Sequence, residues 1–253
     1  MPYARSGYLW LAAVVLLSAN TAAASVAPGC PSVPIPRLTL PVTAAALAAG
    51  EPVTIVALGS SSTAGSGATS ADRTYPARLQ AALRAAWPGA AITVLNRGIG
   101  GEQADQMLAR VGKDVLPAKP TLVIWQAGAN EAIKGMDPAL FQSLLDRGVH
   151  QIQDAGSDVV LMDNQVSPQI ERAAHHEAYV EVVAEEAAAR RVSLFSRTAL
   201  MRAWRAIDPT AHNMVGPDGM HHTDRGYACV AASLARAIEK AVARPVLAAS
   251  IRK

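Results

Sequence analysis

The sequence has 253 residues, of which 51% are hydrophobic and 17% are charged. This length and composition can supply one substantial core without requiring a second domain, and the share of charged residues argues against a disordered chain. The formal net charge is +3, and the Lys and Arg residues form no dense stripe that could follow a phosphate backbone. We therefore expect no nucleic-acid partner.

The first 24 residues show the features of a secretory signal peptide. Arg5 precedes an apolar stretch from Tyr8 to Ser18, and Ala22-Ala23-Ala24 offers a small-residue cleavage site before Ser25. A transmembrane anchor is the alternative, but it needs about 20 apolar residues and this stretch is shorter. We expect removal of residues 1–24, a secreted or periplasmic protein, and no stable membrane insertion of the mature chain.

The next segment, residues 25–50, is rich in Pro and Ala and predicts an arm packed on one domain at 51–245, with a tail at 246–253. The arm contains Cys30, and the only other cysteine in the sequence is Cys229. In an oxidising compartment the two can form a disulfide that connects the arm to the C-terminal helix, whereas two buried free thiols are the alternative.

From residue 51 onward, short apolar runs alternate with amphipathic stretches. The runs are partly β-branched, as is typical of buried parallel strands; five strands are expected, at Val53–Leu58, Ala91–Asn96, Thr121–Gln126, Asp158–Met162 and Val192–Phe195. Helices, many of them Ala-rich, are expected near 75–87, 103–115, 138–154, 171–190 and 223–243. This alternation predicts an α/β fold: a three-layer α/β/α sandwich, flavodoxin-like, with a central parallel sheet of about five strands.

Ligands of such sheets bind at the carboxyl ends of the strands, so the segments that follow the strands are the most informative. A Gly-flanked serine cluster, Gly59 to Gly67, follows the first strand. It could bind a phosphate, form an ordinary turn, or hold a nucleophilic serine at a helix N-terminus. The cluster lacks the glycine-rich phosphate motifs and the G-x-S-x-G elbow of α/β-hydrolases. Taken alone, it favours a turn.

Two further strand ends carry glycines or an amide. Three glycines within four positions, in the segment Asn96 to Glu102, indicate a close approach of the backbone or a positive φ. Asn130 follows the third strand, where its side chain could donate to an oxyanion or cap the next helix.

The last loop contains Asp218, three residues before His221. With Gly219 between them, the carboxylate can accept from the imidazole and leave the other ring nitrogen free as a base. A surface turn is the alternative, and so is a metal site that uses His212, His221 and His222, although their spacing matches no strong zinc pattern. We expect His175 and His176, in a helical stretch, to be solvated.

Together, the order and spacing of these segments resemble the SGNH (GDSL-type) hydrolase superfamily over about residues 52–240. Gly59–Gly65 matches G-D-S-L-[ST]-x-G, Asn96–Gly101 matches N-x-[GS]-x-[SG]-G, Gly128–Glu131 matches G-x-N-D and Asp218–His222 matches D-G-x-H-P. The resemblance implies that Ser61 is the nucleophile and that His221, oriented by Asp218, is the base. It also implies an oxyanion hole formed by the backbone N–H groups of Ser61 and Gly101 and by the side chain of Asn130.

Three positions depart from the family pattern without removing a reacting group. Ser60 and Glu131 stand where the family has Asp, and His222 stands where it has Pro. The change at Ser60 is expected to weaken the network that holds the turn, and it leaves Ser62 as an alternative nucleophile.

The resemblance implies an exported serine esterase that cleaves acetyl or short acyl groups from a small-molecule or glycan ester, with no metal or organic cofactor. An SGNH O-acyltransferase that acts on a glycan and a non-catalytic carbohydrate-binding module are the alternatives. The loop Asn164–Pro168 follows the fourth strand and is expected to line the rim of the pocket. Its polar start favours a small or hydrophilic acyl group.

Overall fold

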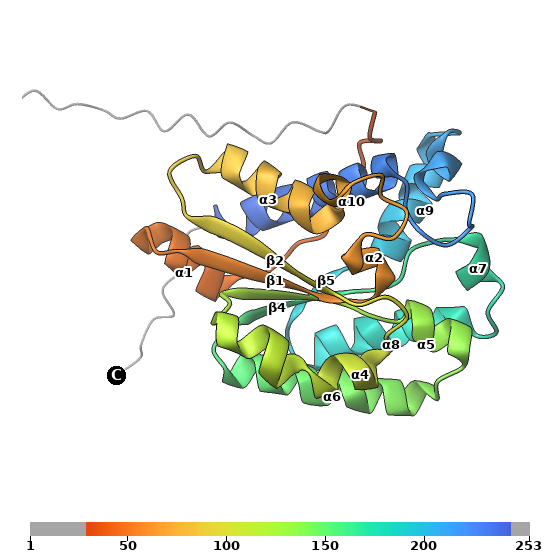
Figure 1. The fold of residues 1–253 in the computed structure, drawn as a ribbon, viewed down its shortest axis with the longest axis horizontal. Coiled ribbons are helices and arrows are strands. Elements are labelled where there is room, and N and C mark those ends of the chain that lie inside the picture. Colours follow the sequence, from red (N-terminus) through yellow and green to blue (C-terminus); the bar gives the residue numbers. More distant parts are fainter. Residues whose placement is uncertain (1–28, 244–253) are drawn as a thin grey trace, which may run out of the picture.

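The computed structural model describes residues 29–243, so the predicted signal peptide, the first residues of the arm and the C-terminal tail lie outside the described residues. Its central sheet contains β1 (Val53–Gly59), β2 (Ile92–Gly98), β3 (Leu122–Gln126), β4 (Asp158–Met162) and β5 (Ser193–Phe195). All neighbouring strands pair in parallel, in the order β2-β1-β3-β4-β5. The predicted three-layer α/β sandwich is confirmed (Figure 1).

Burial and register explain the composition and the ends of the strands. Every residue of β3 and β4 is buried, which explains why these strands are apolar rather than alternating, except for Gln126 at the end of β3 and Asp158 at the start of β4. β1 and β2 each extend beyond the predicted ends, because their register continues to the pair Gly59 and Gly98. This extension brings two glycines side by side at the carboxyl edge of the sheet.

Helices cover both faces of the sheet (Figure 1). One core cluster includes residues of α3 (Tyr75–Ala86), α9 (Arg197–Ile207), α10 (Asp224–Val242) and α1 (Pro41–Ala49). The other includes residues of α4 (Ala104–Ala109), α6 (Pro138–Asp154) and α8 (His176–Ala189). Successive residues of β1 alternate between the two: Ile55 belongs to the first cluster and Val56 to the second.

Several short elements were not predicted. They are α2 (Ser61–Ala64), α5 (Ala129–Lys134), α7 (Pro168–Glu171) and the 3-10 turns Ala71–Arg73, Leu116–Ala118 and Ala211–Met214, besides α1 and α9. The helix expected near 103–115 divides into α4 and a π-helical turn, Val111–Val115. The helix expected near 171–190 begins only at His176, because His175 adopts a left-handed φ of 55°.

The arm is fastened to the sheet and to α10. The Asp158 carboxylate, at the start of β4, accepts bonds from the backbone N–H and the hydroxyl of Thr43, both at 2.8 Å, and so holds the first turn of α1. A disulfide joins Cys30 to Cys229 on α10, across 199 residues of sequence. Within residues 29–243, no helix is both long enough and apolar enough to span a bilayer.

Candidate active site

The serine segment that follows β1 begins where the backbones of β1 and β2 leave room for α2. A Cβ atom added at Gly59 would lie 2.2 Å from the Thr63 hydroxyl, and one at Gly98 would lie 2.1 Å from the backbone nitrogen of Ala64. Any side chain at these positions would push α2 away, so close packing of the helix requires both glycines. Ser61 is the first residue of α2, where N–H groups have no partner within the helix.

The structure brings Ser61, His221 and Asp218 into one hydrogen-bonded chain. His221 Nε2 lies 2.8 Å from Ser61 Oγ, and His221 Nδ1 lies 2.7 Å from Asp218 Oδ2. Ser61 follows β1, whereas Asp218 and His221 lie in the loop before α10. Ser61 and His221 are 160 positions apart in the sequence. Ser61 is 8% exposed, whereas the Asp218 side chain is 46% exposed. The acid is therefore on the solvent side of the chain.

The other oxygen of Asp218 shapes the loop itself. Oδ1 accepts the backbone N–H groups of Met220 at 2.9 Å and His221 at 3.0 Å, while Gly219 takes a φ of +66°. Partial burial acts to raise the pKa of Asp218, but the hydrogen bonds from Met220 and His221 outweigh it and hold that pKa below its usual value. The carboxylate is thus charged at neutral pH and faces the imidazole.

Ser62 points elsewhere. Its hydroxyl donates to Gln165 Oε1 at 3.2 Å, and the residue is 1% exposed. Ser61 has the imidazole as its neighbour, so the two candidate nucleophiles occupy different environments.

The turn at Ser60 is held by an amide of β3. Gln126 Oε1 accepts from the Ser60 backbone N–H at 3.0 Å, from the Ser60 hydroxyl at 3.2 Å and from the Thr63 hydroxyl at 3.1 Å. All three residues are buried. Gln126 thus holds the turn through three bonds, one of them from the Ser60 hydroxyl.

The loop after β2 passes close to Ser61. A Cβ at Gly100 would lie 3.9 Å from the Cβ of Ser61, and Gly101 takes a φ of +80°. Two side chains of α5 hold this loop: Asn130 Nδ2 donates to the Glu102 carbonyl at 2.7 Å, and Lys134 Nζ donates to the Gly101 carbonyl at 2.6 Å. An amide nitrogen has two N–H groups, so this bond fixes Asn130 and still allows the other N–H to reach a substrate oxygen.

Arg110 and Glu131 are further residues of this region whose roles sequence reasoning missed. Arg110 donates to the Arg97 carbonyl at 2.7 Å, to the Gly59 carbonyl at 3.3 Å and to Glu102 Oε2 at 2.8 Å. It therefore joins the ends of β1 and β2 to the loop. Buried Glu131 accepts from the backbone N–H groups of Ala104 and Gly128. Nothing in the local sequence of Arg110 signals this role, because its partners come from three separate segments.

His222 is a buried structural residue. Its Nδ1 lies 3.2 Å from the Met214 carbonyl, and its ring meets the ring of Tyr227 edge-on at 5.3 Å. Burial, aided by the charge of Arg197, lowers the pKa of His222 to about 3, so the ring is neutral at physiological pH.

The other histidines considered in the sequence, His212, His175 and His176, are exposed or partly exposed. His212 lies on the surface, with Nδ1 2.9 Å from the Pro209 carbonyl, and across residues 29–243 no three His, Cys, Asp or Glu side chains gather as a metal site. The metal alternative therefore has no support among the described residues. His175 is exposed, as expected for a solvated pair, but His176 is only partly exposed, with Nε2 3.0 Å from Glu177.

The loop Asn164–Pro168 does not line the rim as expected. Asn164, Gln165, Val166 and Ser167 are all buried, and only Pro168 is exposed. The polar side chains at the start of this loop serve internal hydrogen bonds, for example from Gln165 Nε2 to the Met220 carbonyl at 2.9 Å. They therefore carry no information about the polarity of the acyl group.

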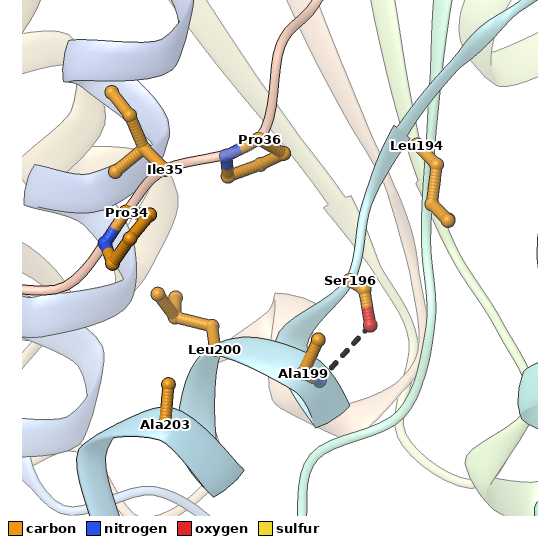
Figure 2. A pocket seen from close by; sticks show the side chains of 8 residues that line it. All are labelled: Pro34, Ile35, Pro36, Leu194, Ser196, Ala199, Leu200 and Ala203. Carbon is orange, nitrogen blue, oxygen red and sulfur yellow. Dashed lines mark hydrogen bonds between the residues drawn. The ribbon is translucent and has the colours of Figure 1, made fainter.

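A cavity of about 330 Å³ lies between the arm, β5 and α9 (Figure 2). Its lining is almost entirely apolar, with Pro34, Ile35 and Pro36 from the arm facing Leu200 and Ala203 of α9. None of the residues assigned to the predicted site lines it.

The fold and the order of these segments define an SGNH-type hydrolase, as the sequence resemblance implied. A family model described as "Non-GDSL lipase-like family" matches residues 30–244. The chain belongs to this family.

Curated relatives and solved structures agree with this class. The chain is 32% identical to an arylesterase of Vibrio mimicus over 97 residues, which are 38% of this chain and 48% of the relative. It is 27% identical to esterase TesA of Pseudomonas aeruginosa over 128 residues, 51% of this chain and 60% of the relative. The chain thus spans about half of the length of the curated relatives it matches.

Two solved structures show the same fold. A lipase/acylhydrolase from Enterococcus faecalis superposes with a TM-score of 0.64 at 24% identity, over 74% of this chain and 96% of that one. A two-domain esterase active on acetylated mannans superposes with a TM-score of 0.68 at 22% identity, over 83% of this chain and 55% of that one.

Proposed function

We propose that the protein is an exported serine esterase in which Ser61 attacks the carbonyl carbon of a carboxylic ester. The observation that carries the proposal is the chain of contacts from Ser61 Oγ to His221 Nε2 at 2.8 Å and from His221 Nδ1 to Asp218 Oδ2 at 2.7 Å. A hydroxyl is a weak nucleophile until an adjacent base takes its proton, and a base oriented by a carboxylate is suited to that task.

The reaction has two half-reactions. As Ser61 Oγ bonds to the carbonyl carbon, its proton passes to His221 Nε2 and the carbonyl oxygen becomes an oxyanion. The carbon–oxygen bond to the alcohol then breaks, and the alcohol leaves with the proton from His221. Water then attacks the carbonyl carbon of the acyl-enzyme and gives a proton to His221. The bond from this carbon to Ser61 Oγ breaks, His221 returns the proton to Oγ, and the acid is released.

The proposed reaction also requires groups that stabilise the oxyanion. We assign its stabilisation to the backbone N–H groups of Ser61 and Gly101 and to the Asn130 side chain. The proximity of Gly100 to Ser61 and the bond from Asn130 to the Glu102 carbonyl support this assignment, because they bring α5, α2 and the loop after β2 together. One such donor typically contributes about 2.7–4 kcal/mol to the stability of the transition state.

We propose an acetyl or short acyl group on a small-molecule or glycan alcohol as the substrate. Support comes from the relatives named as arylesterase and esterase, and from the fold shared with an esterase active on acetylated mannans. Two large apolar side chains in the segments that carry the oxyanion donors, Ile99 and Ile133, are 46% and 42% exposed. We propose that these two side chains contact the acyl group.

Export is proposed on two observations. The first 24 residues have the order of a signal peptide, and the pair Cys30–Cys229 is joined in a disulfide, a bond that persists in oxidising compartments.

A p-nitrophenyl ester series from acetate to decanoate, together with acetylated xylan and mannan, tests the activity and the acyl preference. Ser61→Ala should abolish hydrolysis, whereas Ser62→Ala should lower it and leave measurable activity, because the Ser62 hydroxyl donates to Gln165 and not to His221, so its loss weakens the support of the turn without removing the nucleophile. A fluorophosphonate adduct found on Ser62 by mass spectrometry would overturn the assignment. Addition of a sugar acceptor distinguishes hydrolysis from acyl transfer.

A further inference from the structure

A fully buried amide connects the two loops that carry the proposed nucleophile and base. Gln165, just after β4, is 0% exposed. Its Oε1 accepts from the Ser62 hydroxyl at 3.2 Å, and its Nε2 donates to the Met220 carbonyl at 2.9 Å. Ser62 directly follows Ser61, and Met220 directly precedes His221. One side chain thus bridges the neighbours of both reacting residues from the protein interior.

A buried guanidinium fixes which way this amide points. Arg197, the first residue of α9, is 0% exposed; its Nη2 lies 3.0 Å from Gln165 Oε1 and its Nε donates to the Asp163 carbonyl at 2.8 Å. A guanidinium can only donate, so the Gln165 oxygen must face it. The Gln165 nitrogen must then face the Met220 carbonyl, which can only accept.

We propose that Gln165 and Arg197 are positioning residues that set the separation of Ser61 and His221. This inference rests on the proposed esterase function. A hydrogen bond to a charged donor is stronger than one between neutral groups, so Arg197 holds the Gln165 oxygen firmly. Displacement of a reacting group by about 1 Å can cost about 10²-fold in rate, so a tie of this kind between the two loops has a catalytic consequence.

Gln165→Glu is the informative variant, because it retains part of the network. The carboxylate can still accept from Arg197 and Ser62, but it places an oxygen against the Met220 carbonyl where a donor stood. We expect a folded protein whose kcat falls about 10- to 100-fold with KM changed less than threefold. The rate of fluorophosphonate labelling of Ser61 should fall in parallel with kcat.

Ser157→Ala is the matched control. Ser157 is buried and its hydroxyl donates to the Pro120 carbonyl at 2.7 Å, near the start of β4 and so at the opposite end of the strand from Gln165. It loses one buried hydrogen bond without touching the two loops, so its Tm should fall while kcat and the labelling rate stay unchanged.

If Gln165→Glu is folded and has wild-type kcat and labelling rate, the proposal is overturned. Should that variant not fold, Arg197→Lys and Arg197→Met provide the same test: the lysine retains a charged donor and should retain more kcat than the methionine, and equal kcat values overturn the proposal. If the folded wild type hydrolyses no ester, the esterase proposal fails. The positioning proposal is then decided by the ¹H NMR signal of the proton between His221 and Asp218, which should move in Gln165→Glu; an unmoved signal overturns it.

Discussion

The Asp218 carboxylate both orients His221 and shapes its loop, and substitution by asparagine separates these roles. In Asp218→Asn the amide oxygen can keep the bonds from the backbone N–H groups of Met220 and His221, at 2.9 and 3.0 Å. The amide nitrogen then stands where Oδ2 lay, 2.7 Å from His221 Nδ1. Because that amide nitrogen can only donate, Nδ1 must accept, and the ring proton moves to Nε2. A protonated Nε2 in a neutral ring cannot take the proton of Ser61.

The expected loss of kcat in Asp218→Asn follows from this change of tautomer. In serine proteases the same acid-to-amide change lowers kcat by about 10⁴, which corresponds to about 5.4 kcal/mol. Asp218→Ala removes the acceptor at Nδ1 and also the Oδ1 bonds to the loop, without adding a donor. The Asp218 side chain is 46% exposed, so water can reach Nδ1 in this variant and accept its proton. We expect a loss of about 10²–10³ for the alanine, because a water molecule replaces only part of the orienting bond. The conservative change should therefore be the more damaging one.

Steady-state kinetics with a short-chain p-nitrophenyl ester at pH 7 to 8 measure both variants, with thermal unfolding as the check on folding. His221→Ala gives the floor, since it removes the base altogether. An Asp218→Asn variant that is as active as Asp218→Ala, or more so, would refute the argument that Asp218 selects the tautomer.

Three further predictions concern the oxyanion loop, the packing of α2 and the response to acid. Asn130→Ala should lower kcat about 10²- to 10³-fold with little change in KM in steady-state kinetics, because the bond forms mainly in the transition state. Gly98→Ala should cost at least about 1–3 kcal/mol in urea unfolding and most of the activity, because its methyl would meet the backbone of Ala64. His222→Asn should reduce the loss of stability in acid. The pKa of His222 is lowered from 6.5 to about 3 in the folded protein, so the unfolded chain binds this proton first as pH falls. The stability of the wild type therefore drops between pH 6.5 and about 3.

Each of these has its own control. For Gly98→Ala the control is Gly89→Ala, where an added Cβ meets nothing within 4 Å; equal stabilities of the two variants would contradict the packing argument. A KM effect alone in Asn130→Ala would remove it from the oxyanion hole. For His222 the measured quantity is the difference in unfolding free energy between wild type and variant at pH 7, 5 and 4. It should change by up to about 1.4 kcal/mol per pH unit, and a constant difference would rule out His222 as the source. Burial raises the pKa of Asp163 to about 6, but that group is present in both proteins.

The sheet could be predicted from the sequence because burial on both faces gives a signal that is local. β3 and β4 are mainly apolar runs, with a polar residue only at one end of each, and each was placed to within one residue. The segments α5 and α7 have six and four residues, too short for a periodic pattern, and α1 begins in a Pro- and Ala-rich stretch that resembles an irregular arm. The ends of β1 and β2 are determined by their mutual register, which no single segment contains.

In the candidate site, too, only the residues with a local sequence signal could be predicted. Ser61, Asn130, Asp218 and His221 could be proposed because family motifs surround them in the sequence. The residues that hold these side chains could not, since Gln126, Gln165 and Arg110 act through partners far away along the chain. The prediction for the loop Asn164–Pro168 failed for a related reason. A polar side chain after a strand can face solvent or an internal partner, and the sequence of the loop does not distinguish the two.

The disulfide between Cys30 and Cys229 has a consequence for biosynthesis. Its partners are 199 residues apart, and the sequence holds no third cysteine with which either could mispair. The bond can therefore close only after α10 has been synthesised, when every strand of the sheet is already available to fold. A formed disulfide thus shows that synthesis has passed Cys229: a product truncated before Cys229 carries one free thiol, open to capture by a thiol oxidoreductase or by a second truncated chain.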